Sequence, residues 1–419
     1  MGIEVYIWDH YVGALVKTPE GVAFQYSTAF KKTGLELSPI NLPINEKEVY
    51  INEIDWKATG GIPGLIYDSL PDRFGNDLLR TYFAEKGLTE KDIDIFAKLQ
   101  YIGFRGMGAL EYRPATEIEQ TDDVISLEEI EKISILATKG KEALKTNLED
   151  KKALLQILHI GTSVGGARAK ALIAIHKENG TIKSGQLSLG KEYEYYLIKI
   201  DGANEKELLE PSGFGRLEYT YSQMAKDCMI QMTECFLYKD LHFLTKRFDR
   251  DENGNKIHIH SLCGILGLDY NQIGQYSYEQ YFMAARKLGL GQDTMEEIFK
   301  RMVFNVLVHN CDDHTKNFSF MMHQNGEWFL SPAFDLCYSY SSSNEWVNGH
   351  NMRVNNKRTE ITYDDLMIVG KKFNIKKRKV IFEQIKSVVD QFSKYAIKNN
   401  VKKELIKQVE ENRPRIKIK

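Results

Sequence analysis

The sequence predicts an α+β protein with a small N-terminal domain and a mostly helical C-terminal part. Three observations support this fold class. The chain has 419 residues, which is enough for two or three domains of ~100–200 residues each. Short apolar runs bounded by glycine and proline fill much of the first 250 residues, as in strands joined by turns. From about residue 277 onward, apolar residues recur at helical spacing instead.

Residues 1–115 are predicted to form the N-terminal α+β domain. The stretch VGALVKTPEGVAFQY indicates a hairpin whose turn contains Pro19, Glu20 and Gly21. A Gly/Pro-bounded turn follows and leads to a helix from about Asp77. The polar segment 112–129, which contains Pro114, is expected to be a linker.

Residues 116–245 are predicted to form a second domain. The runs ALIAIH, YEYYLIKI and LHFLTKRF indicate strands, and the segment 216–236 between the last two has apolar residues at helical spacing. Residues 246–419 form the third, mostly helical domain, with amphipathic helices over 277–289 and 293–310 and a Lys-rich helical tail from 376. The Asn325-Gly326 pair predicts a hairpin within it.

Composition and charge exclude several classes of protein. Hydrophobic residues make up 42% and charged residues 27%, a balance typical of a globular protein with a packed core. The 56 Lys and Arg against 58 Asp and Glu give a formal charge of −2, which does not indicate a strongly cationic nucleic-acid binder. No run of 18 apolar residues occurs, so no membrane span is expected.

The cysteines and the N-terminal segment favour the cytoplasm. The 5 cysteines are odd in number and none lies in a C-x-x-C pair, so neither a disulfide framework nor a structural zinc site is expected. The segment MGIEVYIWDH has no basic region and does not indicate a secretory signal.

The segment 309–339 carries the most informative motif. Asp312 and Asn317 are five positions apart, the D-x-x-x-x-N spacing of a protein-kinase catalytic loop, and Asp335 follows the predicted hairpin. In that arrangement the first Asp accepts the proton of the attacking hydroxyl, while the Asn and the later Asp bind Mg²⁺. The alternative is that Asp312, Asp313 and His314 form a loop that caps a helix.

Two upstream features are compatible with nucleotide binding. Gly161 and Gly166 have G-x-x-x-x-G spacing, but Ala167 follows where a Walker A motif needs Lys, so a P-loop NTPase is disfavoured. The segment suits a backbone loop over phosphates, although a simple turn has the same composition. Lys199, late in an apolar strand, is either an exposed strand residue or a phosphate-neutralising lysine, and Glu218 on the following helix could pair with it.

Two other features carry less functional information. His258 and His260 have the period of a strand, and without a third ligand nearby a polar strand face is favoured over a metal pair. The basic run 371–379 is typical of a solvated helix start, and contact with nucleic-acid phosphate is the alternative.

Taken with their order, these motifs resemble the HipA-type serine/threonine kinases, toxins of bacterial toxin–antitoxin modules. GGIPGLIYDSLPDRFG and IGFRGMGALEYRP look like the N-terminal domain of that family. TSVGGARAK looks like its Gly-rich loop, KRFDR like its hinge, and DDHTKN and LSPAFD like its catalytic and metal-binding motifs. The resemblance covers almost the whole chain and implies a bilobal protein-kinase-like fold with an N-terminal accessory domain.

The resemblance implies a role for individual residues. Asp312 is similar to the catalytic base, and Asp313 beside it is a second carboxylate that leaves two candidates. Asn317 and Asp335 resemble the Mg²⁺ ligands, and Ser163 the serine that such kinases autophosphorylate. The residues that resemble an ATP site are Val164, Gly165, Gly166, Ala167, Lys199, Lys246, Phe248 and His314, with Lys246 standing where some relatives have Glu.

The function implied by the resemblance is phosphorylation of a protein Ser or Thr with ATP and Mg²⁺. The implied target is an aminoacyl-tRNA synthetase, whose inhibition would halt translation. The implied partner is a small helix-turn-helix (HipB-like) antitoxin, which brings operator DNA into the complex. The alternatives are a catalytically weak kinase-fold regulator in such a DNA-bound complex and a small-molecule kinase.

Overall fold

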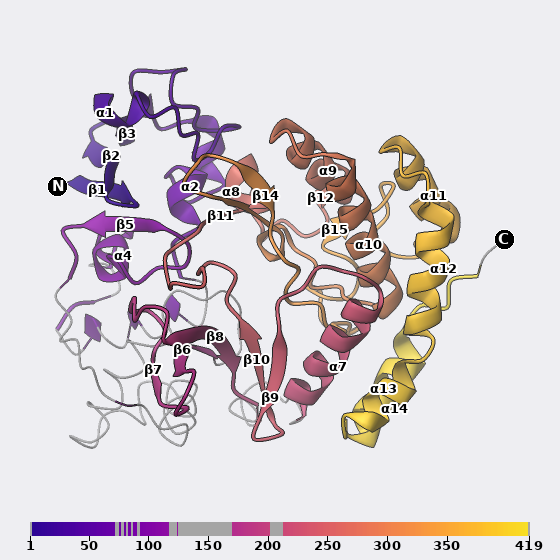
Figure 1. Cartoon of the computed structure of the whole chain (residues 1–419). Helices are drawn as coiled ribbons and strands as arrows, with labels where there is room; N and C mark the ends of the chain where they lie inside the picture. The colour runs from indigo at the N-terminus through magenta and orange to yellow at the C-terminus, as the bar shows by residue number, and fades with distance from the viewer. Residues whose placement is uncertain are drawn as a thin grey trace.

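The computed structural model describes residues 2–71, 93–116, 124, 170–201 and 213–417, together with 75–76, 79–80, 83–84 and 87–89. The predicted Gly-rich loop therefore lies outside the described residues, as does part of the helix expected from about Asp77. The described part has the predicted α+β composition. An N-terminal unit lies beside a second sheet and a helical lobe (Figure 1). The first two long helices of this lobe are α9 (Tyr278–Lys287) and α10 (Gln292–Val308).

The N-terminal unit is an antiparallel sheet with short helices. Its described strands have the order β4-β3-β2-β1-β5. The predicted hairpin is confirmed, because Thr18 pairs with Gly21 across the expected turn. Alternating residues such as Val5, Leu15 and Phe24 face one core. The elements are β1 (Gly2–Ile7), β2 (His10–Thr18), β3 (Gly21–Tyr26), α1 (Thr28–Lys31), β4 (Tyr50–Ile51), the 3₁₀ helix η1 (Ile54–Lys57), α2 (Gly64–Tyr67), α4 (Ile95–Ile102) and β5 (Leu110–Arg113).

The second sheet confirms the three strands predicted between 171 and 248. Its described strands have the order β7-β6-β8-β10-β9, all antiparallel. The boundary expected at 245/246 falls at the last residue of β10. The elements are β6 (Lys170–His176), β7 (Ile182–Ser184), β8 (Tyr193–Lys199), α7 (Phe214–Asp227), β9 (Cys235–Tyr238) and β10 (His242–Lys246).

The helix predicted over 216–236 is shorter in the structure. It ends at Asp227, and the final residues of the predicted helix begin β9 instead. Met229 has φ 57°, a left-handed conformation that a helix cannot continue through. The apolar residues Cys228 and Ile230 on either side of it enter the main core, so apolar residues continue in the sequence past the end of the helix.

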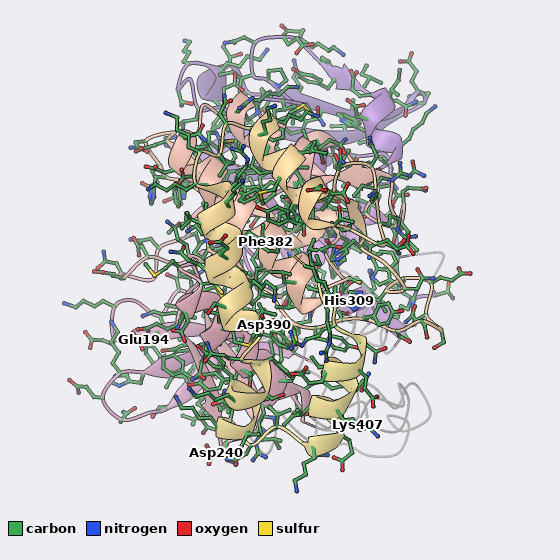
Figure 2. All side chains as sticks on the ribbon, turned by 90° about the vertical axis from the view of Figure 1, so that its right-hand side faces the viewer. Glu194, Asp240, His309, Phe382, Asp390 and Lys407 are labelled. Atoms are coloured by element: carbon green, nitrogen blue, oxygen red, sulfur yellow. The ribbon has the colours of Figure 1, made fainter. Side chains whose placement is uncertain are left out.

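The C-terminal lobe confirms the predicted helices and hairpin. β13 and β14 are antiparallel around Asn325-Gly326, and α12 runs along the lobe from the region of Phe382 to Asp390 (Figure 2). No helix among the described residues is long and apolar enough to cross a membrane. The remaining elements are β11 (His258–Ser261), α8 (Leu262–Leu266), β12 (Tyr276–Ser277), η4 (Thr315–Asn317), β13 (Ser319–Met322), β14 (Trp328–Leu330), β15 (Met352–Arg353), α11 (Tyr363–Lys372), α12 (Arg378–Val389), α13 (Phe392–Lys398) and α14 (Lys403–Asn412).

The face of β11 that was expected to be polar is buried against the N-terminal unit. His258 and His260 are both fully buried. His258 Nε2 lies 3.1 Å from the Leu37 carbonyl oxygen, and His260 Nδ1 lies 2.6 Å from Asp68 Oδ2. The two histidines therefore lie on a strand, as their spacing predicts, but they contact polar groups of the N-terminal unit rather than solvent.

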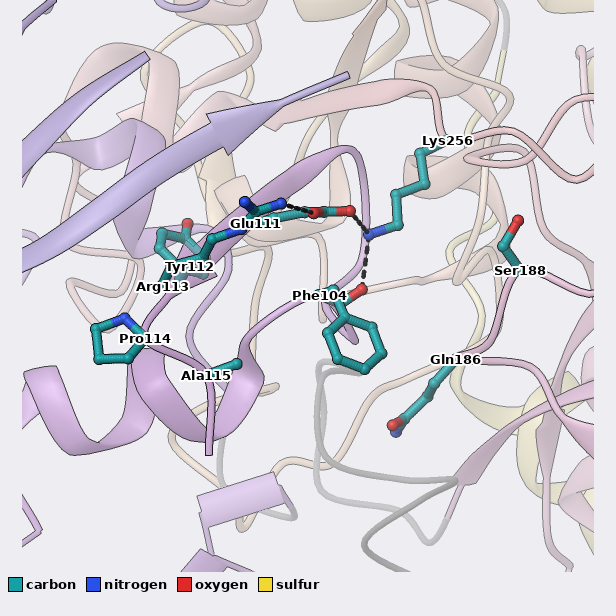
Figure 3. A pocket seen from close by; sticks show the side chains of 9 residues that line it. All are labelled: Phe104, Glu111, Tyr112, Arg113, Pro114, Ala115, Gln186, Ser188 and Lys256. Atoms are coloured by element: carbon teal, nitrogen blue, oxygen red, sulfur yellow. Dashed lines mark hydrogen bonds and ion pairs between the residues drawn. The ribbon is translucent and has the colours of Figure 1, made fainter. Parts of the chain in front are cut away.

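A second polar contact between the domains borders a cavity of about 450 Å³. Lys256 Nζ donates to Glu111 Oε1 at 2.7 Å and to the Phe104 carbonyl oxygen at 2.6 Å (Figure 3). The cavity is lined by Phe104, Glu111, Tyr112, Arg113, Pro114, Ala115, Gln186, Ser188 and Lys256. None of the residues that sequence reasoning assigned to a site lines it.

Replacing Gly64 with alanine is expected to destabilise the contact between α2 and α8. A Cβ at Gly64 would lie 2.0 Å from the Gly264 carbonyl oxygen, which is backbone and cannot rotate away. We expect a loss of about 1–3 kcal/mol in the free energy of unfolding, measured by urea denaturation. Gly2→Ala is the control, because a Cβ there meets its nearest atom at 3.4 Å. Equal stability of the two variants would contradict this packing.

Candidate active site

The loop that carries the predicted catalytic motif begins where α10 ends. His309 closes the helix in a left-handed conformation, φ 59°, and turns the chain toward Asp335. The Asn310 side chain donates to the Asp335 carbonyl oxygen at 3.1 Å, and the Cys311 N–H donates to the Ser339 carbonyl oxygen at 3.0 Å. These bonds hold the loop 309–317 beside the segment that follows the hairpin, so the two halves of the motif are brought together.

The two adjacent carboxylates of this loop have different environments. The Asp312 side chain is 41% exposed, whereas the Asp313 side chain is fully buried. Asp313 accepts hydrogen bonds from the Tyr278 hydroxyl at 2.9 Å and from the Asn351 N–H at 2.7 Å, and it lies 2.8 Å from His350 Nδ1. A carboxylate so occupied is a structural anchor. Asp312 is the one that an acceptor hydroxyl could reach.

Lys199 joins the sheet to the segment after the hairpin. Its Nζ lies 2.5 Å from Glu218 Oε1 on α7 and also pairs with Asp335. Burial alone would lower the pKa of Lys199, but the carboxylates of Asp335 and Glu218 outweigh it and hold that pKa above its usual range. The exposed-strand alternative is therefore wrong, since Lys199 is part of a three-residue charge cluster.

Asp335 has a left-handed backbone conformation. Its φ is 52°, in a region that Asp adopts more readily than most non-glycine residues. Burial alone would raise the pKa of Asp335, but Lys199 and Lys170 hold it below its usual range. The carboxylate is therefore charged at neutral pH, as a metal ligand must be.

The approach of α7 to the sheet explains how Glu218 reaches Lys199. A Cβ at Gly215 would lie 2.1 Å from the Leu241 carbonyl oxygen, so only glycine lets the first turn of α7 come this close to β10. Asp201, just after β8, accepts from the N–H groups of Gly213 and Gly215 at 2.9 and 3.0 Å. The helix start is thus fixed next to the strand that carries Lys199.

Two further predicted residues adjoin Asp312. The Asn317 side-chain NH₂ donates to the Asp312 carbonyl oxygen at 2.8 Å, which leaves its amide oxygen as a potential metal ligand. His314 Nε2 lies 3.8 Å from Asp312 Oδ1. Burial lowers the pKa of His314, so the ring is neutral at pH 7. Its Nδ1 is buried and has no hydrogen-bond partner in the described part of the chain.

These residues fit a nucleotide with a divalent cation. His314, whose Nδ1 has no hydrogen-bond partner among the described residues, is close enough to Asp335 to help lower the pKa of its carboxyl group. An Asp carboxylate and an Asn amide oxygen are hard ligands suited to Mg²⁺, which usually takes phosphate oxygens and water for the rest of its shell. Within the described ranges, no group of three or more His, Cys, Asp or Glu side chains could hold a metal ion.

The predicted hinge residues lie at the end of β10. Lys246 Nζ lies 2.8 Å from Glu194 and 3.8 Å from Glu234, so its ammonium group is already paired. The Phe248 ring contacts the Phe334 ring at 5.6 Å between centroids, and Phe334 directly precedes Asp335. Ser163, Val164, Gly165, Gly166 and Ala167 lie outside the described residues.

Sequence reasoning missed two residues at this site. Lys170 starts β6 opposite Lys199 and acts electrostatically on Asp335. The available signal was that Lys170 is the last residue of the motif TSVGGARAK. Trp346 donates its indole N–H to Asp312 Oδ1 at 2.5 Å. No local pattern marks Trp346, because its contact depends on how the segment after Asp335 folds back.

Comparison with known proteins agrees with this architecture. Residues 162–396 match the family model of the HipA-like C-terminal domain, and residues 3–113 match that of the HipA N-terminal domain. A crystallised Shewanella oneidensis HipA, in a complex with HipB and operator DNA, has the same fold with a TM-score of 0.66. It is 16% identical in sequence, and the match covers 98% of this chain and 94% of that one.

Two curated relatives match shorter stretches. A candidate kinase of Haemophilus influenzae is 34% identical over 109 residues, 24% of this chain and 31% of the relative. A second candidate kinase, Y4dM of Sinorhizobium fredii, is 28% identical over 154 residues, 35% of this chain and 36% of the relative. The matched stretches thus span about a third of the length of these relatives.

Proposed function

The chain belongs to the HipA-like family, and on that premise we propose that it is an ATP- and Mg²⁺-dependent serine/threonine protein kinase that acts as the toxin of a toxin–antitoxin system. One observation carries the proposal. Lys199 is held between Glu218 and Asp335, with Asp312 on the adjoining loop. A lysine paired with a helix glutamate beside a metal-binding aspartate is the arrangement that protein kinases require for catalysis.

Each side chain has a definite task in the proposed reaction. Asp312 accepts the proton of the acceptor hydroxyl while the oxygen of that hydroxyl forms a bond to the γ-phosphorus of ATP. The bond between the γ-phosphorus and the departing oxygen of ADP breaks. Lys199 neutralises the phosphates, and Glu218 keeps Lys199 directed toward them. Asn317 and Asp335 would hold Mg²⁺, which supplies neutralisation of phosphate charge.

The remaining ATP contacts are proposed from family resemblance. Val164, Gly165, Gly166 and Ala167 would cover the phosphates with backbone N–H groups. Lys246 and Phe248 would border the adenine, and His314 would approach the nucleotide through Nδ1, which has no hydrogen-bond partner among the described residues. Because the Lys246 ammonium is paired with Glu194, its contribution to adenine binding would come from the backbone.

The proposed partners follow from the family and from the Shewanella complex. We propose a helix-turn-helix, HipB-like antitoxin that links the kinase to operator DNA, and a cytoplasmic aminoacyl-tRNA synthetase as the phosphorylated protein. The structurally similar protein is bound to HipB and operator DNA, which supports the first proposal. The target class rests on family resemblance alone.

The decisive experiment measures transfer of labelled γ-phosphate from ATP. Purified chain is incubated with MgATP alone, with a cell lysate or purified aminoacyl-tRNA synthetases, or with small-molecule acceptors. Labelled protein that contains phosphoserine or phosphothreonine is expected. Transfer to small molecules only would favour the small-molecule kinase, and no turnover in a protein that still binds the antitoxin would favour the non-catalytic regulator.

Ser163 is expected to be phosphorylated by a second copy of the kinase, with loss of ATP affinity. A phosphate adds about −1.5 to −2 charges at pH 7, which would repel the ATP phosphates and compete for the same N–H donors. Mass spectrometry locates the phosphate, with Thr162 as the competing position, and calorimetry compares ATP binding with Ser163→Ala. Complete phosphorylation with undiminished ATP affinity would refute this regulation and leave the kinase assignment standing.

A further inference from the structure

We infer that Trp346 is a positioning residue for the catalytic base, an inference that rests on the proposed kinase function. Its indole Nε1–H donates to Asp312 Oδ1 at 2.5 Å. In the described part of the chain, that bond is the sole side-chain hydrogen bond to the Asp312 carboxylate. The remaining polar neighbour, His314 Nε2, is 3.8 Å away, which is beyond hydrogen-bond distance.

The need for such a restraint follows from the exposure of Asp312. Its side chain is 41% exposed, so its rotamer is not determined by close packing. A general base must lie within about 2.6–3.2 Å of the proton that it accepts, and small displacements of a reacting group cost large factors in rate. Because the indole occupies Oδ1, Oδ2 remains available to accept the proton of the acceptor hydroxyl.

Trp346 can fix Asp312 because Trp346 is itself fixed to the same loop. Asn351 donates its side-chain NH₂ to the carbonyl oxygens of Trp346 and Cys311, both at 2.9 Å. The Asn351 N–H donates to the buried Asp313 carboxylate at 2.7 Å. The Trp346 N–H donates to Asn344 Oδ1 at 3.0 Å. The Asn351 bonds therefore tie the segment to the catalytic loop after the indole, and the Cys311 N–H bond to the Ser339 carbonyl oxygen ties it before the indole.

This arrangement gives Asp313 a role distinct from that of Asp312. Asp313 anchors the returning segment through Asn351 and His350, and that segment places the indole on Asp312. Aromatic neighbours hold the indole plane, since the rings of His314 and Tyr270 lie 5.7 and 6.5 Å from it between centroids. Asp313 thus holds the segment that carries Trp346, and Trp346 in turn orients Asp312.

The test is Trp346→Phe, which keeps an aromatic ring and removes the N–H donor. Because a misplaced reacting group costs large factors in rate, kcat for phosphoryl transfer should fall by roughly 10- to 100-fold. The KM for MgATP should stay nearly unchanged, because phenylalanine keeps an aromatic ring beside His314, the proposed ATP-site residue that Trp346 contacts. Trp8→Phe is the matched control, as it removes an indole bond of 2.8 Å to the carbonyl oxygen of Lys256, which is not a residue of the proposed site.

A double-mutant cycle separates positioning from a general structural effect. In an Asp312→Asn background, Trp346→Phe should produce no further loss of kcat, because the residue acts through the carboxylate that is already removed. Asn344→Ala is a second variant, at an exposed residue that loosens the indole without disturbing the core. It should lower kcat by a smaller factor.

Three results would overturn the inference. The first is an unchanged kcat in both Trp346→Phe and Asn344→Ala. The second is a raised kcat in Trp346→Phe, which would show that the indole blocks the base. The third is a raised KM for the protein acceptor with no change in kcat, which would show that Trp346 contacts the substrate instead. Each requires an active wild-type protein. A wild-type protein without phosphoryl transfer would contradict the proposed function itself, so the two failures are distinguishable.

Discussion

Replacing Asp312 with asparagine is expected to lower the rate of phosphoryl transfer by ~10²–10⁴-fold, the usual contribution of one general base. Asparagine retains the shape of the side chain and its acceptor oxygen, so the bond from Trp346 can persist. MgATP affinity should be preserved, because Lys199, Asp335 and Asn317 are unchanged. Single-turnover kinetics measures the loss, and calorimetry measures the affinity.

Asp313→Asn provides the contrast to this variant. Asp313 is buried and bonded to Tyr278, His350 and Asn351, so its replacement should lower stability, measured as a lower midpoint of thermal unfolding. Asp312→Asn should leave that midpoint nearly unchanged. If Asp313→Asn abolished transfer in a stably folded protein while Asp312→Asn did not, the base would be Asp313.

Asp335→Ala is expected to abolish Mg²⁺-dependent nucleotide affinity, and with it the toxicity of the expressed protein. The variant removes a proposed metal ligand and also one of the two carboxylates that pair with Lys199. Titration calorimetry with ATP should show binding that no longer responds to Mg²⁺. Growth of cells that express the variant reports the loss of toxicity.

Glu252→Ala is the control for this experiment, since Glu252 is an exposed carboxylate in a turn outside the site. It should bind MgATP as the wild type does. A folded Asp335→Ala protein with unchanged MgATP affinity would count against the kinase interpretation of the segment 309–339, whereas unchanged toxicity with lost affinity would count only against the proposed link between catalysis and toxicity.

Much of the architecture could be predicted from the sequence because it depends on local periodicity. The hairpins at 19–21 and 325–326, the strands that carry Lys199 and Lys246, and the helices α9 and α10 follow from patterns within a single element. The order of the motifs along the chain also identified Asp312, Asn317 and Asp335 as one group. The Asn310 and Cys311 bonds to residues 335–339 place two of these segments side by side.

What the sequence by itself determined was therefore which residues are candidates for the proposed chemistry, since spacing within a loop or strand is a property of the chain. Only the tertiary structure decided how each one is used. Asp312 and Asp313 are adjacent and chemically identical, but packing buries one and exposes the other. The Lys199–Glu218 pair, the burial of His258 and His260, and the bond from Trp346 to Asp312 each join segments that are distant along the chain. Such contacts arise where separate elements pack against one another, and no local pattern records them.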